Sequence, residues 1–240
     1  MTSHVVWPDG QRKPGLRRKN LKAIIEYINY HEPDKIINLG DWWDMPSLET
    51  YSPATASSRE HKRIRRDIEA GNDDMKFIMD NLKYDPELIF CHGNHEYRLT
   101  RLGELDAKFE GMFDDAFYLE GWDVYDFLTP VCVDGVHYCH YFVNQYTGKP
   151  LGGTALSQLK NLGFSFTAGH KQCLDIARMD RNDGSTVQGL IAGASYTHDE
   201  GYKGAQGNGH WRGIVHKTNV KNGTYDLSTT HINNLIKDFT

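Results

Sequence analysis

The stretch that decides the fold is Cys91-His92-Gly93-Asn94-His95-Glu96, which follows the apolar run Leu88-Ile89-Phe90. A short apolar run that ends at a glycine predicts a buried strand, and the residues after Glu96 have a helical pattern. A strand that ends in Gly-Asn-His where a helix begins would place an amide oxygen and an imidazole side by side. This stretch therefore predicts a polar site at the edge of a sheet.

Two further strand ends have the same character. Gly40-Asp41-Trp42-Trp43-Asp44 follows the apolar run Ile36–Leu39, and Gly169-His170-Lys171-Gln172 follows residues 164–167. Acidic residues at the end of an apolar strand need a partner or a cation, because burying an unpaired carboxylate costs several kcal/mol. Three strand ends with metal-binding types of side chain thus predict one site assembled across a sheet.

Each candidate also has an ordinary interpretation. Asp9 and Gln11, which lie two apart in the turn after strand Ser3–Trp7, would aim to the same side in an extended chain, but a turn aspartate can cap its own backbone. Asn94 can be a helix cap, His95 a surface imidazole and His170 a core histidine. The predicted site is absent only if all of these ordinary interpretations are correct at once.

Composition is that of an ordinary soluble protein. The 240 residues are 39% hydrophobic and 25% charged, so a single α/β domain over residues 1–240 is expected. Residues 1–7 lack the pattern of a secretory signal, and no run approaches the ~20 apolar residues of a membrane span. The four cysteines have no Cys-x-x-Cys spacing, which favours free buried thiols in a cytoplasmic protein.

The net charge of −5 is unevenly distributed. Residues 1–66 carry 12 Lys/Arg against 8 Asp/Glu, whereas the remainder carries 15 against 24. The basic residues form two groups, Arg12, Lys13, Arg17, Arg18, Lys19 and Lys22, and then Arg59, Lys62, Arg63, Arg65 and Arg66. They are either solvated helix faces or a surface that attracts an anionic substrate toward the first two motifs.

The order of elements predicts the architecture. Strands at 3–7, 35–39 and 86–91 alternate with helical patterns at 17–31, 56–83 and 95–108, the second of which Gly71-Asn72 could interrupt. After Gly121 the chain is mostly strands, with one helix at 154–162 and a hairpin at 221–223; the strands are expected at 124–127, 131–133, 136–140, 164–167, 174–178, 186–192, 213–220 and 224–228. Two packed sheets with helices outside are therefore expected.

Several catalytic motifs are excluded. The stretch after His95 lacks the second histidine of a zinc-protease helix, and the chain has neither a Gly-x-Ser-x-Gly elbow nor a Walker-type phosphate loop. Ligands of the Asp, Asn, Gln and His types without cysteine favour borderline-to-hard divalent metals. The Gly-rich stretch 193–213 is either a rim of the site or a plain connection.

At the strand-end motifs, the chain resembles the calcineurin-like metallophosphoesterase superfamily. The resemblance runs from about residue 3 to residue 175, through Asp9-x-Gln11, Gly40-Asp41-x-x-Asp44, the Asn-His-Glu block at 94–96 and Gly169-His170-x-Gln172. Pro8-Asp9-x-Gln11 with Lys13-Pro14-Gly15 after it is similar to a phage-type subgroup, which would act in the host cytoplasm. The resemblance implies an α/β fold of two packed mixed β-sheets flanked by helices, a four-layer sandwich.

The resemblance also implies a centre of two divalent metal ions. Asp41 would bridge both ions; Asp9, Gln11 and Gln172 would hold the first. The second would bind Asn94, His170 and the histidine of strand 136–140, for which His140 is preferred to His137 as it lies nearer the strand's end. Since Gln11 and Gln172 stand where the family has histidine, the protein ligands of the first ion would all be oxygen atoms. Such a shell suits Mn²⁺, Mg²⁺ or Ca²⁺ better than Fe or Zn²⁺ and would hold the first ion weakly. For the centre as a whole the expected metal is Mn²⁺, with Mg²⁺, Ni²⁺, Fe and Zn²⁺ as alternatives.

The implied function is metal-dependent hydrolysis of a phosphomonoester or phosphodiester. A hydroxide bridging the two ions would attack phosphorus, His95 would assist the leaving group and Asp44 would orient His95. Arg98 and His198 are further candidates for substrate binding. The alternatives are a phosphodiesterase or nuclease acting on nucleic acid, and a catalytically weak metal-binding scaffold. The expected partner is an anionic phosphate ester, without a membrane; the oligomeric state stays open.

Overall fold

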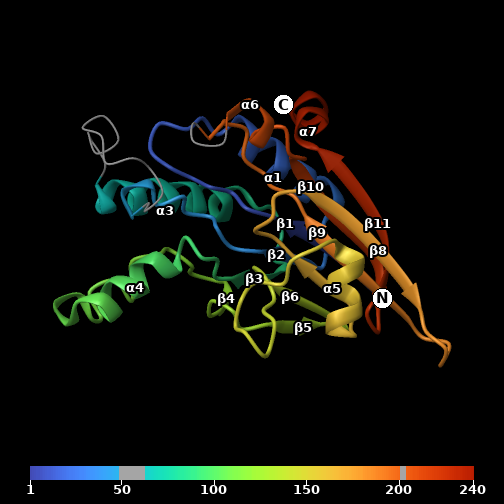
Figure 1. The fold of residues 1–240 in the computed structure, drawn as a ribbon. Helices are drawn as coiled ribbons and strands as arrows, with labels where there is room; N and C mark the ends of the chain where they lie inside the picture. The colour runs from blue at the N-terminus through green and yellow to red at the C-terminus, as the bar shows by residue number, and fades with distance from the viewer. Residues whose placement is uncertain (49–62, 201–203) are drawn as a thin grey trace.

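The computed structural model describes residues 1–48, 63–200 and 204–240 (Figure 1). In the first part, strands and helices alternate: β1 (Thr2–Trp7), α1 (Lys19–His31), β2 (Lys35–Asn38), η1 (Pro46–Leu48), α3 (Ile64–Asn81), β3 (Glu87–Cys91), α4 (Tyr97–Leu105), η2 (Ala107–Phe109) and β4 (Asp123–Tyr125). The rest is mostly strands: β5 (Val131–Val133), β6 (Val136–Cys139), α5 (Ala155–Leu162), β7 (Phe166–Ala168), β8 (Leu174–Asp180), β9 (Thr186–Ala192), α6 (Gly204–Gly207), β10 (Gly213–Lys221), β11 (Thr224–His231) and α7 (Ile232–Phe239).

The strands form two mixed sheets. The first has the order β11-β10-β1-β2-β3-β4, in which β1 to β4 run parallel and β10 and β11 pair antiparallel. The second has the order β5-β6-β7-β9-β8, with β6, β7 and β9 parallel and an antiparallel strand at each edge. The predicted α/β class with two mixed sheets is therefore confirmed.

Alternation along the strands builds the layers. Val5 and Trp7 of β1 face the helices α1, α3 and α7, whereas Val6 between them faces the second sheet. Ile36 and Ile37 of β2 divide in the same way. On its outer face the second sheet packs against α5, through Phe166 of β7 among others. The result is a helix, sheet, sheet, helix arrangement (Figure 1).

Helix α3 differs from its prediction. The helix continues through Gly71-Asn72, which the sequence left open as a point of interruption. Residues 56–62 of the predicted helix, which include Arg59 and Lys62, lie outside the described part. A Cβ at Gly71 would lie 2.0 Å from Cδ1 of the Trp43 indole, and Trp42 Nε1 donates to the Gly71 carbonyl over 3.1 Å. The glycine thus serves close packing of the tryptophans rather than a break.

Helix α7 was not predicted, so the expectation of a single helix in the second half was wrong. Its apolar residues recur at helical spacing, Ile232, Leu235, Ile236 and Phe239, and they pack against the same core as α1. This helical spacing is visible in the sequence, but α7 follows β11 without a turn residue between them. The thiols also differ from expectation, because Cys91 and Cys139 are buried whereas Cys132 and Cys173 are exposed.

Two members of the first basic group are held by the fold, whereas Arg17, Lys19 and Lys22 are exposed. Arg12, which is only 3% exposed, and Arg18 both donate to the Asp74 carboxylate of α3 over 2.5 Å. These guanidinium groups anchor the chain after β1 to α3 and are therefore neither a solvated face nor a free anion-binding surface. Lys13 points elsewhere, into the site described below.

Among the described residues, no helix is both long and apolar enough to cross a membrane.

A polar network lies between the two sheets, away from the strand ends. His4 is fully buried, with Nδ1 2.8 Å from the Tyr138 hydroxyl and Nε2 2.9 Å from Asp134 Oδ2. The Lys217 ammonium, also fully buried, donates to Thr167 Oγ1 and to the Tyr138 hydroxyl. Burial lowers the pKa of His4 to about 4 and that of Lys217 well below its usual value.

This network predicts a loss of stability in acid. Because His4 takes up its proton near pH 6.5 when unfolded but only near pH 4 when folded, its contribution is complete above pH 6.5 and is lost as pH falls toward 4. Between pH 7 and 5, the wild type should lose about 2 kcal/mol more free energy of unfolding than His4→Gln. Urea unfolding in EDTA measures this difference. Between pH 7 and 8 the free energies of unfolding of the two proteins should change by the same amount. Equal acid losses would show that His4 is not the titrating group.

Candidate metal centre

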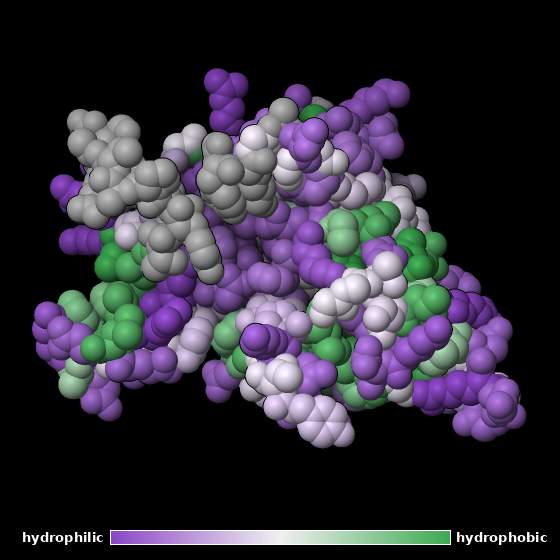
Figure 2. Space-filling model, in the orientation of Figure 1, coloured by the Kyte–Doolittle hydropathy of each residue, from purple (hydrophilic) through white to green (hydrophobic). Residues whose placement is uncertain are grey.

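The predicted ligands lie at the carboxyl ends of strands in both sheets. Asp9, Asp41 and Asn94 follow the parallel neighbours β1, β2 and β3, while His140 and His170 follow the parallel neighbours β6 and β7. Since neighbouring parallel strands end at the same edge, the five side chains converge where the two sheets meet. Figure 2 shows hydrophilic residues gathered in the middle of the face drawn in Figure 1.

Asp41 lies at the centre of this group. Its Oδ2 is 3.3 Å from His140 Nε2 and 3.6 Å from His95 Nε2, and its Oδ1 accepts from the His95 backbone N–H over 2.9 Å. One ligand atom each of Asp41, His140 and His170 lie within 4.8 Å of one another, a spacing that suits a metal ion. The tight turn needs Gly40, because a Cβ there would lie 2.3 Å from the Cys91 carbonyl oxygen.

His140 is oriented as a metal-binding histidine would be. It is fully buried, and its Nδ1 donates to the Leu39 carbonyl over 2.7 Å while Nε2 lies 3.0 Å from Asn94 Oδ1. Its pKa is raised to about 9: burial opposes the imidazolium, but the carboxylates of Asp41 and Asp9 outweigh it. A cation would take the place of the Nε2 proton. His137 instead packs at a tilt against the Phe164 ring, with ring centroids 4.1 Å apart, so the geometry favours His140.

The three residues predicted for the first ion, Asp9, Gln11 and Gln172, are all buried. Asp9 is fully buried, and its carboxylate accepts from the His170 backbone N–H over 3.1 Å and from Gln172 Nε2 over 3.4 Å. Burial and the charge of Asp41 raise the pKa of Asp9 to about 6 against the opposing effect of His140. Gln11 Oε1 is buried and has no hydrogen-bond partner within the described part of the chain. A buried carbonyl oxygen without a hydrogen-bond donor fits a bound cation.

The amide oxygen of Gln172 is not free to bind a cation in its present orientation. Its Oε1 accepts from the Tyr196 hydroxyl over 3.0 Å, so the amide oxygen is already engaged. A half-turn of the amide would free the oxygen for a cation, and the Tyr196 hydroxyl could then accept from Nε2 instead. This rearrangement would add to the cost of filling the first site.

His95 projects into the site from the start of α4. Its Nδ1 lies 2.8 Å from the main-chain oxygen of Asp44 and 3.4 Å from the Asp44 carboxylate, so the main chain is the nearer partner. Although burial opposes the charged form, Asp41 and Asp44 raise the pKa of His95 above its usual value. Asp44 is held ionised, its pKa lowered to about 2, because contacts from His95 and Lys13 outweigh burial. Its Oδ2 lies 2.8 Å from the Lys13 ammonium.

Glu96 has a role that the sequence interpretation missed. Its carboxylate is 1% exposed and accepts three backbone N–H groups, from Gly93 over 2.8 Å, Asp41 over 2.9 Å and Trp43 over 3.0 Å. It thereby ties the loop after β2 to the loop after β3. An acidic residue three positions after the start of the turn, as in a capping box, was the available signal.

The two candidate substrate residues are already engaged. Arg98 Nη1 donates to the main-chain oxygens of Asp44 over 2.9 Å and Met45 over 3.3 Å, so it supports the loop after β2. His198 Nε2 lies 2.6 Å from Glu200 Oε1, which also binds Lys13. Ligand atoms of Asp44, His198 and Glu200 lie within 4.8 Å of one another. His198 therefore reaches the wall of the site beside Asp44.

The first part of the Gly-rich segment 193–213 is hydrogen-bonded to the loop that carries Asp9. The Ser195 N–H donates to the Asp9 carbonyl over 2.9 Å, and its hydroxyl lies 2.8 Å from the Pro8 carbonyl. With His198 and Glu200 on the wall beside Asp44, residues 193–200 form one side of the site. Residues 201–203 of the same segment lie outside the described part.

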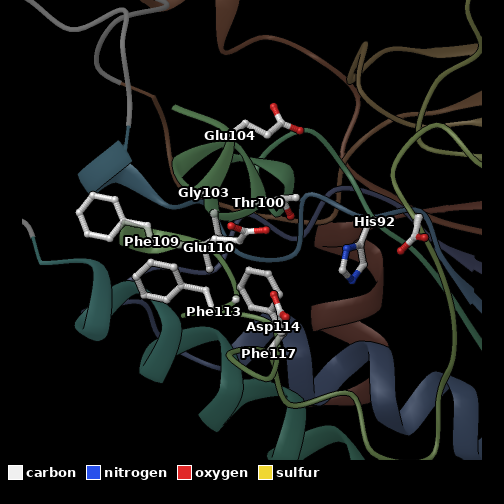
Figure 3. Close-up of a pocket in the computed structure, with 12 residues that line it drawn as sticks. His92, Thr100, Gly103, Glu104, Phe109, Glu110, Phe113, Asp114 and Phe117 are labelled. Carbon is white, nitrogen blue, oxygen red and sulfur yellow. The ribbon is translucent and has the colours of Figure 1, made fainter. Parts of the chain in front are cut away.

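A large hollow lies one strand further along the edge, beside α4. It has a volume of about 810 Å³, and Figure 3 shows Phe109, Phe113 and Phe117 on one side and His92 on the other. Among the described residues, its lining holds four carboxylates and no lysine or arginine: Glu104, Glu110, Asp114 and Asp126. This charge disfavours an anionic ligand there.

Comparison with known proteins gives a partial match. No protein-family model matches the chain. Over 100 residues the chain is 30% identical to the Gene 54 protein of Mycobacterium phage L5, a match that covers 41% of this chain and 38% of that protein. The similarity thus concerns less than half of either chain.

Proposed function

We propose that this protein is a metal-dependent phosphoesterase of the calcineurin-like type, with two divalent cations at the candidate metal centre. The observation that carries the proposal is the convergence of Asp41 with His140 and His170 on one side and with Asp9 on the other. The buried, unpartnered oxygen of Gln11 supports it independently. Four-layer packing of two mixed sheets agrees with the fold of that superfamily.

The residues divide between two positions that share Asp41. Asp9, Gln11 and Gln172 would complete the first, and Asn94, His140 and His170 the second. When bound, two such cations make water more acidic and neutralise charge on phosphoryl oxygens. His95 holds a proton on Nε2, which faces Asp41, and delivers it to the leaving oxygen, while Lys13 and Asp44 keep the adjoining wall in place.

The donor set points to Mn²⁺ or Mg²⁺ at the first position, with Ni²⁺, Fe and Zn²⁺ as alternatives. Carboxylate and amide oxygens suit hard cations, whereas the second position has two imidazoles and should bind more firmly. The engagement of Gln172 with Tyr196 further weakens the first position. The similarity to a mycobacteriophage protein supports the proposal that the chain is phage-encoded and acts in the host cytoplasm.

Metal removal and replacement test the proposal. EDTA treatment should abolish hydrolysis of p-nitrophenyl phosphate and bis-(p-nitrophenyl) phosphate, and millimolar Mn²⁺ should restore it better than Zn²⁺. Comparing the two esters distinguishes monoesterase from diesterase or nuclease activity. Asp41→Asn should lose metal and activity together, because the shared ligand is weakened for both ions.

The contrary outcomes are equally definite. No hydrolysis of either ester with any of Mn²⁺, Mg²⁺, Ni²⁺ or Zn²⁺, despite bound metal, would leave the metal-binding scaffold as the function. Tight, equal occupancy of both positions by zinc from purification would contradict the weak first position.

A further inference from the structure

A smaller cavity adjoins the candidate metal centre on its other side. It has a volume of about 320 Å³, and Ala168 at the end of β7, Ile191 near the end of β9, Leu151 and Gln158 of α5 line it. His170 and the neighbouring Lys171 line it, as does Tyr141, the residue after His140. The Tyr141 and His170 ring centroids are 4.7 Å apart. A group in this cavity would therefore lie directly beside a phosphate at the metal centre.

The charge of this cavity suits an anionic substrate, in contrast to the acidic hollow of Figure 3. Lys171 lies at its wall, with its ammonium donating to the Gly153 carbonyl, and no carboxylate is present among its described lining residues. Its volume is at the lower end of the range for small-molecule sites and suits a single planar ring system. Tyr141 supplies an aromatic surface on which such a ring could stack.

Gln158 of α5 contributes a buried amide to the lining of the cavity. Its side chain is 3% exposed and lines the cavity, and its Nε2 donates to the Leu151 carbonyl over 3.1 Å. Because that carbonyl can only accept, the orientation of the amide is determined. Oε1 makes no hydrogen bond to any described residue, and Nε2 keeps a second hydrogen. The cavity thus offers an acceptor beside a donor.

We propose that this cavity binds the base of a nucleotide substrate, and that the base carries an amino group beside a ring nitrogen acceptor, as adenine does. Glutamine amides pair with adenine in this way, through two parallel hydrogen bonds. Hypoxanthine, which has an oxygen in place of the amino group, would face Gln158 Oε1 with a second acceptor. The proposal rests on the proposed function, since it takes the phosphate of that nucleotide to be the group hydrolysed.

Discrimination between AMP and IMP tests the proposal. With Mn²⁺, kcat/KM should be at least about tenfold higher for AMP, the usual cost of leaving buried polar groups mispaired. Gln158→Leu should bring the ratio toward one, whereas Tyr141→Leu should raise KM for both nucleotides and keep the ratio. Asn161→Leu, an exposed change on the same helix outside the cavity, is the matched control and should keep the wild-type ratio.

A binding measurement separates this proposal from the proposed function. NMR titration in EDTA should show adenosine shifting resonances of Gln158 and Tyr141 more strongly than inosine at equal concentration. If adenosine binds selectively but no ester is hydrolysed, the proposed base site is supported and the proposed phosphoesterase activity is refuted. If esters are hydrolysed but AMP and IMP are equivalent and neither nucleoside binds, the base site is refuted. Should Gln158→Leu fail to fold, the wild-type AMP to IMP ratio and the titration decide alone.

Discussion

Replacing His95 with alanine is expected to lower kcat by about 10²- to 10⁴-fold while both metal positions keep their occupancy. The reason is geometric: His95 Nε2 lies 3.6 Å from Asp41 Oδ2, inside the site, but the proposed ligand sets are complete without it. Steady-state hydrolysis of bis-(p-nitrophenyl) phosphate, with metal counted per chain by atomic emission, measures both quantities on one preparation.

Asp44→Asn is the informative comparison. Because His95 Nδ1 lies nearer to the main-chain oxygen of residue 44 than to its carboxylate, this substitution should leave the imidazole oriented and cost much less turnover. If His95→Ala instead lost metal in proportion to activity, His95 would be a ligand and its assignment as a proton donor would be wrong. If Asp44→Asn matched His95→Ala, the carboxylate rather than the main chain would orient the ring.

Replacing Glu96 with alanine is expected to lower the free energy of unfolding by at least about 3 kcal/mol. The substitution leaves three backbone N–H groups without their acceptor, and each hydrogen bond to a charged group contributes about 1.5–3 kcal/mol, though not additively. Since two of those N–H groups belong to Asp41 and Trp43, the same change should release the loop that carries the shared aspartate. Urea unfolding in EDTA gives the stability, and isothermal titration with Mn²⁺ gives the affinity.

The matched control is Glu104→Ala at the other end of α4. Glu104 accepts from the Tyr97 hydroxyl over 2.6 Å at an exposed position, so its loss should change stability by less than about 1 kcal/mol. A comparably small effect at Glu96 would show that its three hydrogen bonds do not hold the two loops together. Full Mn²⁺ affinity in Glu96→Ala would show that Asp41 stays in place without them.

The outline of the fold followed from local patterns because those patterns are local in origin. Apolar runs ending in glycine marked β2 and β3 to within about one residue, and the 3.6-residue repeat of Leu21, Ile24 and Ile28 marked α1. The same rules failed where a local signal had a distant cause. Gly71 resembled a break although it accommodates the Trp43 indole. Helix α7 begins directly at the end of β11, with no glycine or proline between them to mark the change from strand to helix.

By itself, the sequence determined the α/β class and the placing of Asp9, Asp41, Asn94 and His170 at strand ends, since strand periodicity and turn residues are properties of adjacent positions. Tertiary structure alone decided what depends on which strands become neighbours. The β10–β11 hairpin joins the first sheet, His140 rather than His137 faces Asp41, and Glu96 gathers the N–H groups of two loops. These contacts join residues between 55 and about 210 positions apart. Strand pairing and the packing of one sheet on the other bring them together, and no short window of sequence contains either.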